Sequence, residues 1–100
     1  MTLYQKLLIA AIYVLGFDTP VDITFEHGGH NYSVYNYIEK SSRGLDVGVE
    51  FTVDDDGEDD YLYDDLWWEI RRDNRVNRER LYEACKAIVA AEARGFTEEY

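Results

Sequence analysis

The sequence contains little cysteine, little proline and few basic residues. Cys85 is the one cysteine among 100 residues, so no internal disulfide can form, which fits a reducing compartment. Pro20 is the one proline and lies in a short predicted connector. Ten basic residues stand against 21 acidic ones, giving a formal net charge of −11. Because nucleic acids and anionic membranes are bound through Lys and Arg, this balance argues against direct contact with either.

The sequence also lacks a hydrophobic run long enough to cross a bilayer. Its most apolar segment, residues 7–16, has ten residues, about half of the ~20 that a transmembrane helix needs. Only one basic residue, Lys6, precedes this segment, and no A-x-A cleavage pattern follows it, so the segment does not fit a signal peptide. We therefore expect a buried helix in a cytoplasmic protein.

What the sequence does contain is material for one folded core. Hydrophobic residues make up 46% of the chain and aromatic residues 15%, a composition that argues against disorder despite the charge. A length of 100 residues fits a single domain. We expect that domain to span residues 1–100, with residues 96–100 as a loose tail.

The first sixteen residues carry the signals of a helix. Thr2 and Gln5 fit a capping box, and Gly16 supplies a C-terminal stop. Between them an apolar stripe recurs at helical spacing, formed by Leu8, Ala11, Ile12 and Leu15. Ile9 and Val14 widen this stripe, so we expect the helix to be buried on more than one side.

A β-hairpin is predicted immediately after this helix. Apolar and polar residues alternate over residues 21–26, as in a half-buried strand. Gly28 and Gly29 form a two-residue loop that can take the positive φ angles of a tight turn. The turn sets the cross-strand pairs, which are His27–His30, Phe25–Tyr32 and Ile23–Val34.

A longer alternating run follows a polar turn predicted at residues 40–44. Its apolar side consists of Leu45, Val47, Val49, Phe51 and Val53. Its polar side consists of Asp46, Gly48, Glu50, Thr52 and Asp54. The pattern predicts a strand with one buried face and one acidic face that points to solvent.

Residues 61–72 fit two different structures. A helix capped by Asp59 or Asp60 is favoured by apolar residues at i, i+3, i+4 and i+7, namely Tyr63, Leu66, Trp67 and Ile70. Alternatively, residues 61–63 complete a hairpin through Asp56 and Gly57, and a short helix follows.

A final helix is predicted to begin at Asp73 or Asn74 and to end at Gly95. Its buried side consists of Leu81, Ala84, Cys85 and Ile88. The predicted fold class is α+β: an N-terminal helix, an antiparallel sheet of three to four strands, and one or two C-terminal helices packed on the sheet. The residues expected at the centre of the core are Leu8, Ile12, Ile23, Val34, Val49, Phe51, Leu81 and Ile88.

No motif in the sequence indicates catalysis, a cofactor or a metal site. It contains no phosphate loop, nucleophile elbow or dinucleotide fingerprint. His27 and His30 beside Glu26 fall short of the three or four ligands of a zinc site. An EF-hand aligned on Gly57 would place Tyr63 where the bidentate Glu is required. We therefore expect a protein that is not an enzyme and that binds no cofactor and no metal.

The distribution of acidic residues carries more information than any motif. Residues 46–69, called here the acidic belt, hold eleven acids and no base, and five arginines crowd into residues 71–80. A surface that serves solubility alone intermixes the two signs. On a helix Asp65, Glu69 and Asp73 would stack at i, i+4 and i+8, at a cost of a few tenths of a kcal/mol for each like-charge pair.

The spacing of these acids suggests a function. Carboxylates one helical turn apart are about 5–6 Å from each other, and alternate strand residues are about 6.6 Å apart. Phosphates along a nucleic-acid strand have a similar spacing, and interleaved Tyr and Trp can anchor a protein contact. The predicted partner-binding residues are Asp46, Glu50, Asp54, Asp55, Asp56, Glu58, Asp59, Asp60, Tyr61, Tyr63, Asp64, Asp65, Trp68 and Glu69.

In its size, its acidic belt and its predicted order of elements, the chain resembles the small acidic phage inhibitors of the anti-CRISPR and anti-restriction kind. The resemblance implies a DNA mimic that occupies the basic nucleic-acid-binding groove of a nuclease or effector complex, in the host cytoplasm if the protein is phage-encoded. The chain also resembles acidic immunity proteins that neutralise nuclease toxins. A third alternative is a structural or interaction domain whose acidic face serves only solubility. The sequence leaves the oligomeric state open.

Overall fold

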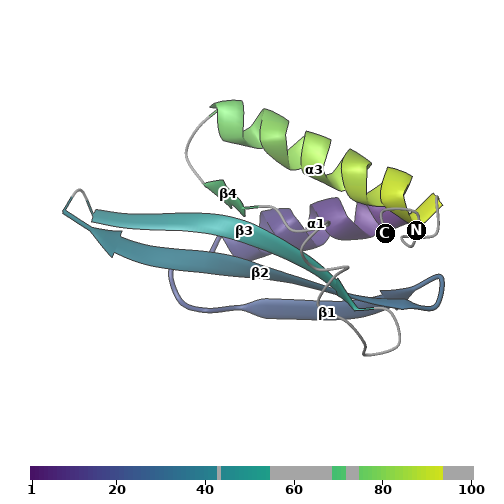
Figure 1. Cartoon of the computed structure of the whole chain (residues 1–100). Coiled ribbons are helices and arrows are strands. Elements are labelled where there is room, and N and C mark those ends of the chain that lie inside the picture. The colour runs from purple at the N-terminus through teal and green to yellow at the C-terminus, as the bar shows by residue number, and fades with distance from the viewer. Residues whose placement is uncertain (43, 55–68, 72–74, 94–100) are drawn as a thin grey trace.

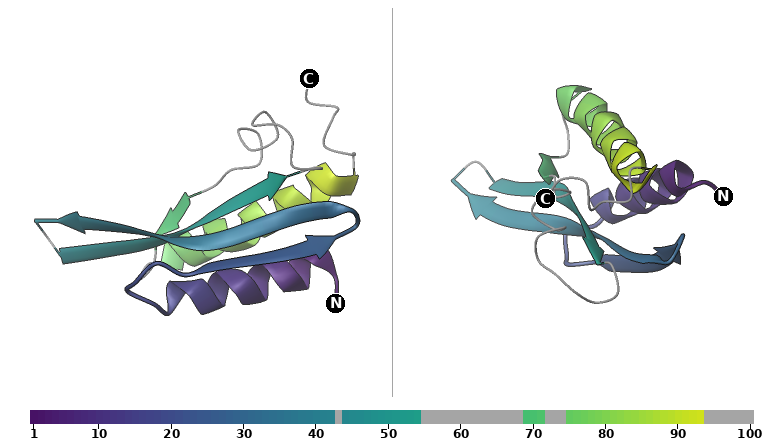
Figure 2. Two further views of the ribbon diagram at one scale, coloured as in Figure 1. Left: turned by 90° about the horizontal axis from the view of Figure 1, so that it is seen from below. Right: turned by 45° about the vertical axis from the view of Figure 1, so that its right-hand side comes forward.

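The computed structural model describes residues 1–42, 44–54, 69–71 and 75–93, and it places two helices on one face of an antiparallel sheet (Figure 1). The elements follow in the order α1 (Leu3–Leu15), β1 (Asp22–His27), β2 (His30–Ser41), β3 (Gly44–Asp54), β4 (Glu69–Arg71) and α3 (Arg75–Ala93). The four strands lie in sequence order in the sheet, so β1 and β4 are its edges. Figure 2 shows α1 running alongside β1, with α3 on the same side of the sheet. The α+β fold expected from the sequence is confirmed.

Helix α1 begins at the capping box that the sequence predicts. The N–H of Thr2 donates to Oε1 of Gln5 at 2.9 Å, and the N–H of Gln5 donates to Oγ1 of Thr2 at 3.2 Å. At the other end the N–H of Gly16 donates to the carbonyl oxygen of Tyr13 at 3.1 Å. These bonds satisfy backbone groups that the helix itself cannot pair.

The buried face of α1 differs from the one expected. The buried residues are Leu3, Leu7, Ala10, Ala11 and Val14. Ile12, expected in the core, is 56% exposed, and Leu8 is only half-buried. Nearly every residue of α1 is apolar, so apolar spacing fits several faces equally well and contact with the sheet and α3 decides which one is buried.

The β1–β2 hairpin has the predicted turn and register. Gly28 and Gly29 have φ angles of 62° and 86°, which strain most residues other than glycine. The cross-strand pairs are those expected: His27 with His30, Phe25 with Tyr32, and Ile23 with Val34.

Strands β2 and β3 form the centre of the sheet. Ser41 pairs with Gly44, so the strands extend into residues 40–44, for which the sequence pattern predicts a turn only. Along β3, Val47, Val49, Phe51 and Val53 are buried, as predicted.

The fourth strand comes from an unexpected segment. Glu69–Arg71 pairs with β3 and sets Ile70 opposite Val49. The helical alternative for residues 61–72 is therefore wrong at its C-terminal end. The other alternative, a strand at residues 61–63, lies outside the described residues.

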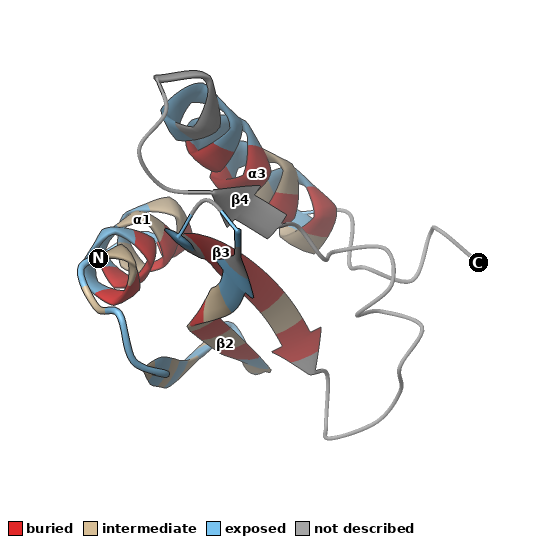
Figure 3. Cartoon of the chain, turned by 90° about the vertical axis from the view of Figure 1, so that its left-hand side faces the viewer, coloured by how far each residue is buried: buried red, intermediate tan, exposed pale blue. Residues whose placement is uncertain are grey.

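The core lies between the sheet and the two helices, as the burial colours in Figure 3 show. The expected core residues Val34, Val49, Phe51, Leu81 and Ile88 are buried. Ile23 packs against the core but is half-buried, because β1 is an edge strand. Ala84 and Cys85 are buried on α3, as predicted.

The connector between α1 and β1 is fixed by Asn36, a buried residue of β2 that is 5% exposed. Its Oδ1 accepts a hydrogen bond from the N–H of Val21 at 2.7 Å. Its Nδ2 donates to the carbonyl oxygens of Phe17 at 3.1 Å and Thr19 at 2.8 Å. One side chain thus satisfies three backbone groups of the connector.

Candidate functional site

The face of the sheet turned away from α1 and α3, called here the outer face, is polar. Residues that are directly opposite in an antiparallel pair share a face, and the two faces alternate along each strand. Tyr32, Val34 and Phe51 contact the helices, so the intervening residues belong to the outer face. Its described side chains are Asp22, Thr24, Glu26, Asn31, Ser33, Tyr35, Tyr37, Glu39, Glu50 and Thr52.

The structure gives a position to four residues of the acidic belt. The register sets Asp46 opposite Glu39 and Asp54 opposite Asn31. Glu50 lies opposite Tyr35 of β2 and opposite Glu69 of β4. All four belt residues therefore occupy outer-face positions of the strands. The other predicted site residues lie outside the described part of the chain, namely Asp55, Asp56, Glu58, Asp59, Asp60, Tyr61, Tyr63, Asp64, Asp65 and Trp68.

Two residues of the belt differ from what the sequence pattern suggests. Glu50 was expected to point to solvent, yet it is 7% exposed; it lies in β3 between β2 on one side and β4 on the other. The stack of Asp65, Glu69 and Asp73 that a helix over residues 61–72 would produce does not include Glu69, because Glu69 lies in strand β4. The outer face also carries exposed charge that the predicted site did not include.

Three exposed acids that the site prediction did not include contribute that charge. Asp22 and Glu26 of β1 and Glu39 of β2 are exposed on the outer face. In the sequence each of these acids alternates with residues of the opposite face, and this period of two indicates on which face of the sheet the acid lies. Pairing with β3 brings them onto the same face as the belt residues of β3.

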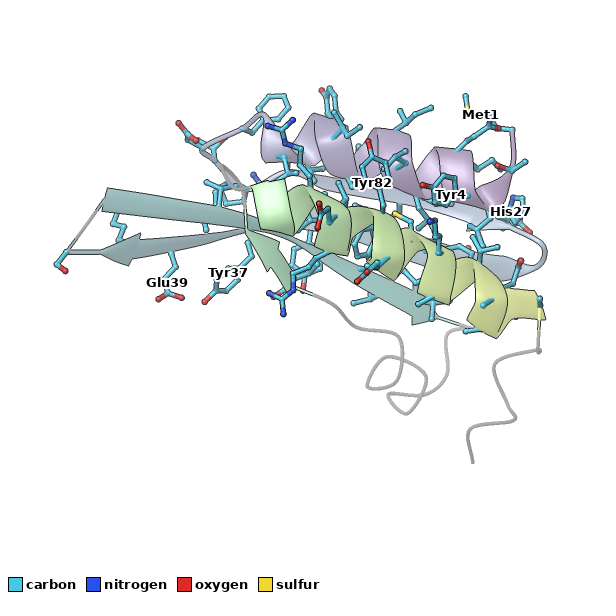
Figure 4. All side chains as sticks on the ribbon, turned by 90° about the horizontal axis from the view of Figure 1, so that it is seen from above. Met1, Tyr4, His27, Tyr37, Glu39 and Tyr82 are labelled. Carbon is cyan, nitrogen blue, oxygen red and sulfur yellow. The ribbon has the colours of Figure 1, made fainter. Side chains whose placement is uncertain are left out.

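Two tyrosines on the outer face were also missed. Tyr35 and Tyr37 of β2 are half-buried there, and the hydroxyl of Tyr37 donates a hydrogen bond to the carboxylate of Glu39. Figure 4 shows the labelled side chains of Tyr37 and Glu39 next to each other on β2. Tyr37 lies opposite Gly48, a residue without a side chain, which leaves room for an aromatic ring.

A cluster that could hold a metal and a reactive cysteine are both absent from the described residues. Within residues 1–42, 44–54, 69–71 and 75–93, no group of three or more His, Cys, Asp and Glu residues is placed to hold a metal ion. Cys85 is fully buried, and burial raises the pKa of its thiol to about 12. A thiol with that pKa is a poor nucleophile near neutral pH, because the thiolate is the reactive form.

The chain has no significant match among protein-family models, curated proteins or solved structures. Neither described helix has the length and apolar character needed to cross a membrane.

Proposed function

We propose that this protein binds, through the outer face and the acidic segment 55–68, a basic groove that its partner protein uses for nucleic acid. The observation that supports this most directly is the separation of charge between the two faces of the sheet. The outer-face positions of the described strands hold seven acids, Asp22, Glu26, Glu39, Asp46, Glu50, Asp54 and Glu69, and one base, Arg71. The helix-facing positions of the same strands hold no acid.

The dimensions of a sheet suit such a role. Alternate residues of a strand are about 6.6 Å apart and neighbouring strands about 4.8 Å apart. Phosphates of a nucleic-acid strand follow each other on a comparable scale, with one charge for about every 3.4 Å of axis. A sheet can thus hold carboxylates at the spacing at which a basic groove binds phosphates.

The tyrosines strengthen the proposal. Tyr35 and Tyr37 lie among the acids of the outer face and are partly accessible. Tyrosine is enriched among the residues that dominate interface energies, because it offers a large rigid surface with a polar end. The acids would speed the encounter and select a basic partner, while the tyrosines would supply apolar contact.

Charge reversal tests the proposal. The variant Glu39→Lys, Asp46→Lys, Asp54→Lys changes three outer-face positions of adjacent strands. The immobilised protein is exposed to a nuclease-treated bacterial lysate, and retained proteins are identified by mass spectrometry. Wild type should retain a basic nucleic-acid-binding protein and release it near 0.5 M salt, where the Debye length falls to about 4 Å. The variant should lose about tenfold or more of this capture.

A matched control separates position from net charge. Asp18, Glu79 and Glu83 are exposed and lie off the sheet, so Asp18→Lys, Glu79→Lys, Glu83→Lys makes the same charge change elsewhere. This control should keep its capture, and an added DNA duplex should compete with wild type. Equal capture by both triple variants would mean that the outer face is only a solvated surface.

The identity of the captured protein separates the two resemblances. A CRISPR or restriction effector would indicate a phage inhibitor acting in the host cytoplasm. A single nuclease toxin would indicate an immunity protein. Retention through high salt would favour an apolar structural interface instead.

A further inference from the structure

A second surface, distinct from the outer face, lies between helix α1 and edge strand β1. A groove of about 510 Å³ separates the two elements. The residues that line it and matter here are Lys6, Ile9, Tyr13, Ile23 and Phe25. Ile9 and Tyr13 are each 54% exposed. Apolar side chains of this size are therefore left open beside the edge of the sheet.

The backbone of β1 is arranged to accept another strand. The N–H of Asn36 donates to the carbonyl oxygen of Val21 at 3.2 Å. Because hydrogen-bonded pairs alternate along an antiparallel ladder, this bond fixes which residues of β1 face β2. The N–H and C=O groups of Asp22, Thr24 and Glu26 consequently point to the edge, where the described sheet has no further strand.

The two sides of β1 have opposite character. On the outer face Asp22 and Glu26 are exposed and flank Thr24. On the helix side lies the apolar groove, whose described lining includes the cation Lys6; the Nζ of Lys6 is 5.9 Å from the ring centroid of Phe25. An added strand would therefore meet carboxylates with one set of alternate side chains and apolar surface with the other.

We propose that β1 and the adjoining groove bind an extended segment of a partner protein as a fifth strand. The segment alternates apolar and basic side chains: the apolar ones enter the groove, and the basic ones pair with Asp22 and Glu26. Backbone hydrogen bonds to the edge supply affinity, and the alternate side chains supply selectivity. A basic residue in the apolar set is rejected by Lys6. This inference does not rest on the proposed function, because it concerns the edge of β1 and the groove beside it and a different mode of contact, although Asp22 and Glu26 also belong to the outer face.

Charge also argues against a second copy of this chain as the occupant. In an antiparallel β1–β1 pair centred on Thr24, Asp22 of each copy lies opposite Glu26 of the other. Like charges directly opposite destabilise a sheet, and each copy carries a net charge of −11. A basic segment removes both penalties.

The test uses a capped seven-residue peptide, Lys-Val-Lys-Val-Lys-Val-Lys, and the full chain. A second peptide of the same composition in blocks, Val-Val-Val-Lys-Lys-Lys-Lys, controls for plain charge attraction. We expect the alternating peptide to bind at least tenfold more tightly. We also expect the amide protons of Asp22, Thr24 and Glu26 to become protected from hydrogen exchange when it binds.

Two pairs of variants locate the contact. Thr24→Pro removes an outward N–H and should weaken alternating-peptide binding about tenfold, while Thr24→Val keeps this N–H and should not. Ile9→Lys places a charge in the groove and should have a similar effect. Ile12→Lys makes the same change at an exposed position outside the groove and should leave binding intact. Thermal unfolding of each variant checks that the fold is preserved.

Several outcomes would overturn the inference. Equal binding of the two peptides would reduce the contact to general charge attraction. Protection of the edge amides in the free protein at low concentration would mean that this chain already covers its own edge. A concentration-dependent dimer that Thr24→Pro dissociates would make a second copy the occupant.

Discussion

Replacing Asn36 by alanine should be among the most damaging single changes in this protein. The side chain is 5% exposed and makes three hydrogen bonds, to the N–H of Val21 and to the carbonyl oxygens of Phe17 and Thr19. A net hydrogen bond contributes about 1 kcal/mol, and a polar group left buried without a partner costs about 1–3 kcal/mol. The three bonded groups are partly buried, so water can repair some of the loss. We expect Asn36→Ala to lower the free energy of unfolding by about 2–4 kcal/mol.

Urea unfolding followed by circular dichroism measures this loss, and hydrogen exchange locates it. The amide of Val21 should lose protection before the amides in the middle of β2, because the connector opens first. Asn31→Ala is the matched control, since Asn31 lies on the same strand but is exposed. That control should change stability by less than about 0.5 kcal/mol. If the two variants are equally stable, Asn36 does not hold the connector in the way described.

Three further predictions concern the hairpin turn, the core and the cysteine. Gly28→Val with Gly29→Val should destabilise the domain markedly in thermal unfolding, since both positions have positive φ; unchanged stability would contradict the turn. Phe51→Ala should cost about 3–5 kcal/mol in urea unfolding, because Phe51 is 1% exposed, and a cost below about 1 kcal/mol would mean that this ring is not central. Iodoacetamide should alkylate Cys85 far more slowly in the folded protein than in urea at pH 8. The pKa of the buried thiol is raised from 9.0 to about 12, so the free energy of unfolding should also fall as pH rises from 9 towards 12. Equal alkylation rates in the two states would show that this thiol is accessible.

The β1–β2 hairpin could be predicted from sequence because two local signals agree there. Gly28-Gly29 requires a tight turn, and the alternation on both sides of it permits only one register that buries Phe25 and Tyr32 together. Each signal depends on residues within a few positions of the turn. Agreement of local preferences with the global fold is what makes such an element predictable.

The buried face of α1 could not be predicted in the same way. A helix that is apolar almost all round gives no single direction for burial, so Leu7 and Ile12 were equally good core candidates from spacing alone. Only the positions of the sheet and α3 distinguish them, and these contacts link residues far apart in the sequence.

The candidate site was only partly predictable, for a similar reason. Alternation correctly put Asp46, Glu50 and Asp54 on one side of β3. Strand β4, whose Glu69 lies opposite Glu50, forms from a segment with helical apolar spacing, and pairing with β3 overrides that local pattern. Asn36 interrupts the apolar alternation of β2 after Tyr32 and Val34, and that interruption was a signal. Its partners, however, lie 15 to 19 residues earlier in the chain, and no local pattern identifies them.

The packing of α3 against α1 and the sheet has a consequence for the moment at which this protein can fold. The hydrophobic core joins the first helix to the last one. It contains Leu3 and Leu7 of α1 together with residues of α3, namely Leu81, Ala84, Cys85, Ile88 and Ala91. A ribosome adds about 5–20 residues per second. Several seconds therefore pass between the synthesis of β3 and the synthesis of α3. During that interval Val34 and Phe51 lack the contact with α3 that buries them in the folded protein, and β3 and β1 have unpaired strand edges. The nascent chain is therefore most exposed to aggregation just before α3 is made, and chaperone binding should be strongest on chains arrested before residue 81.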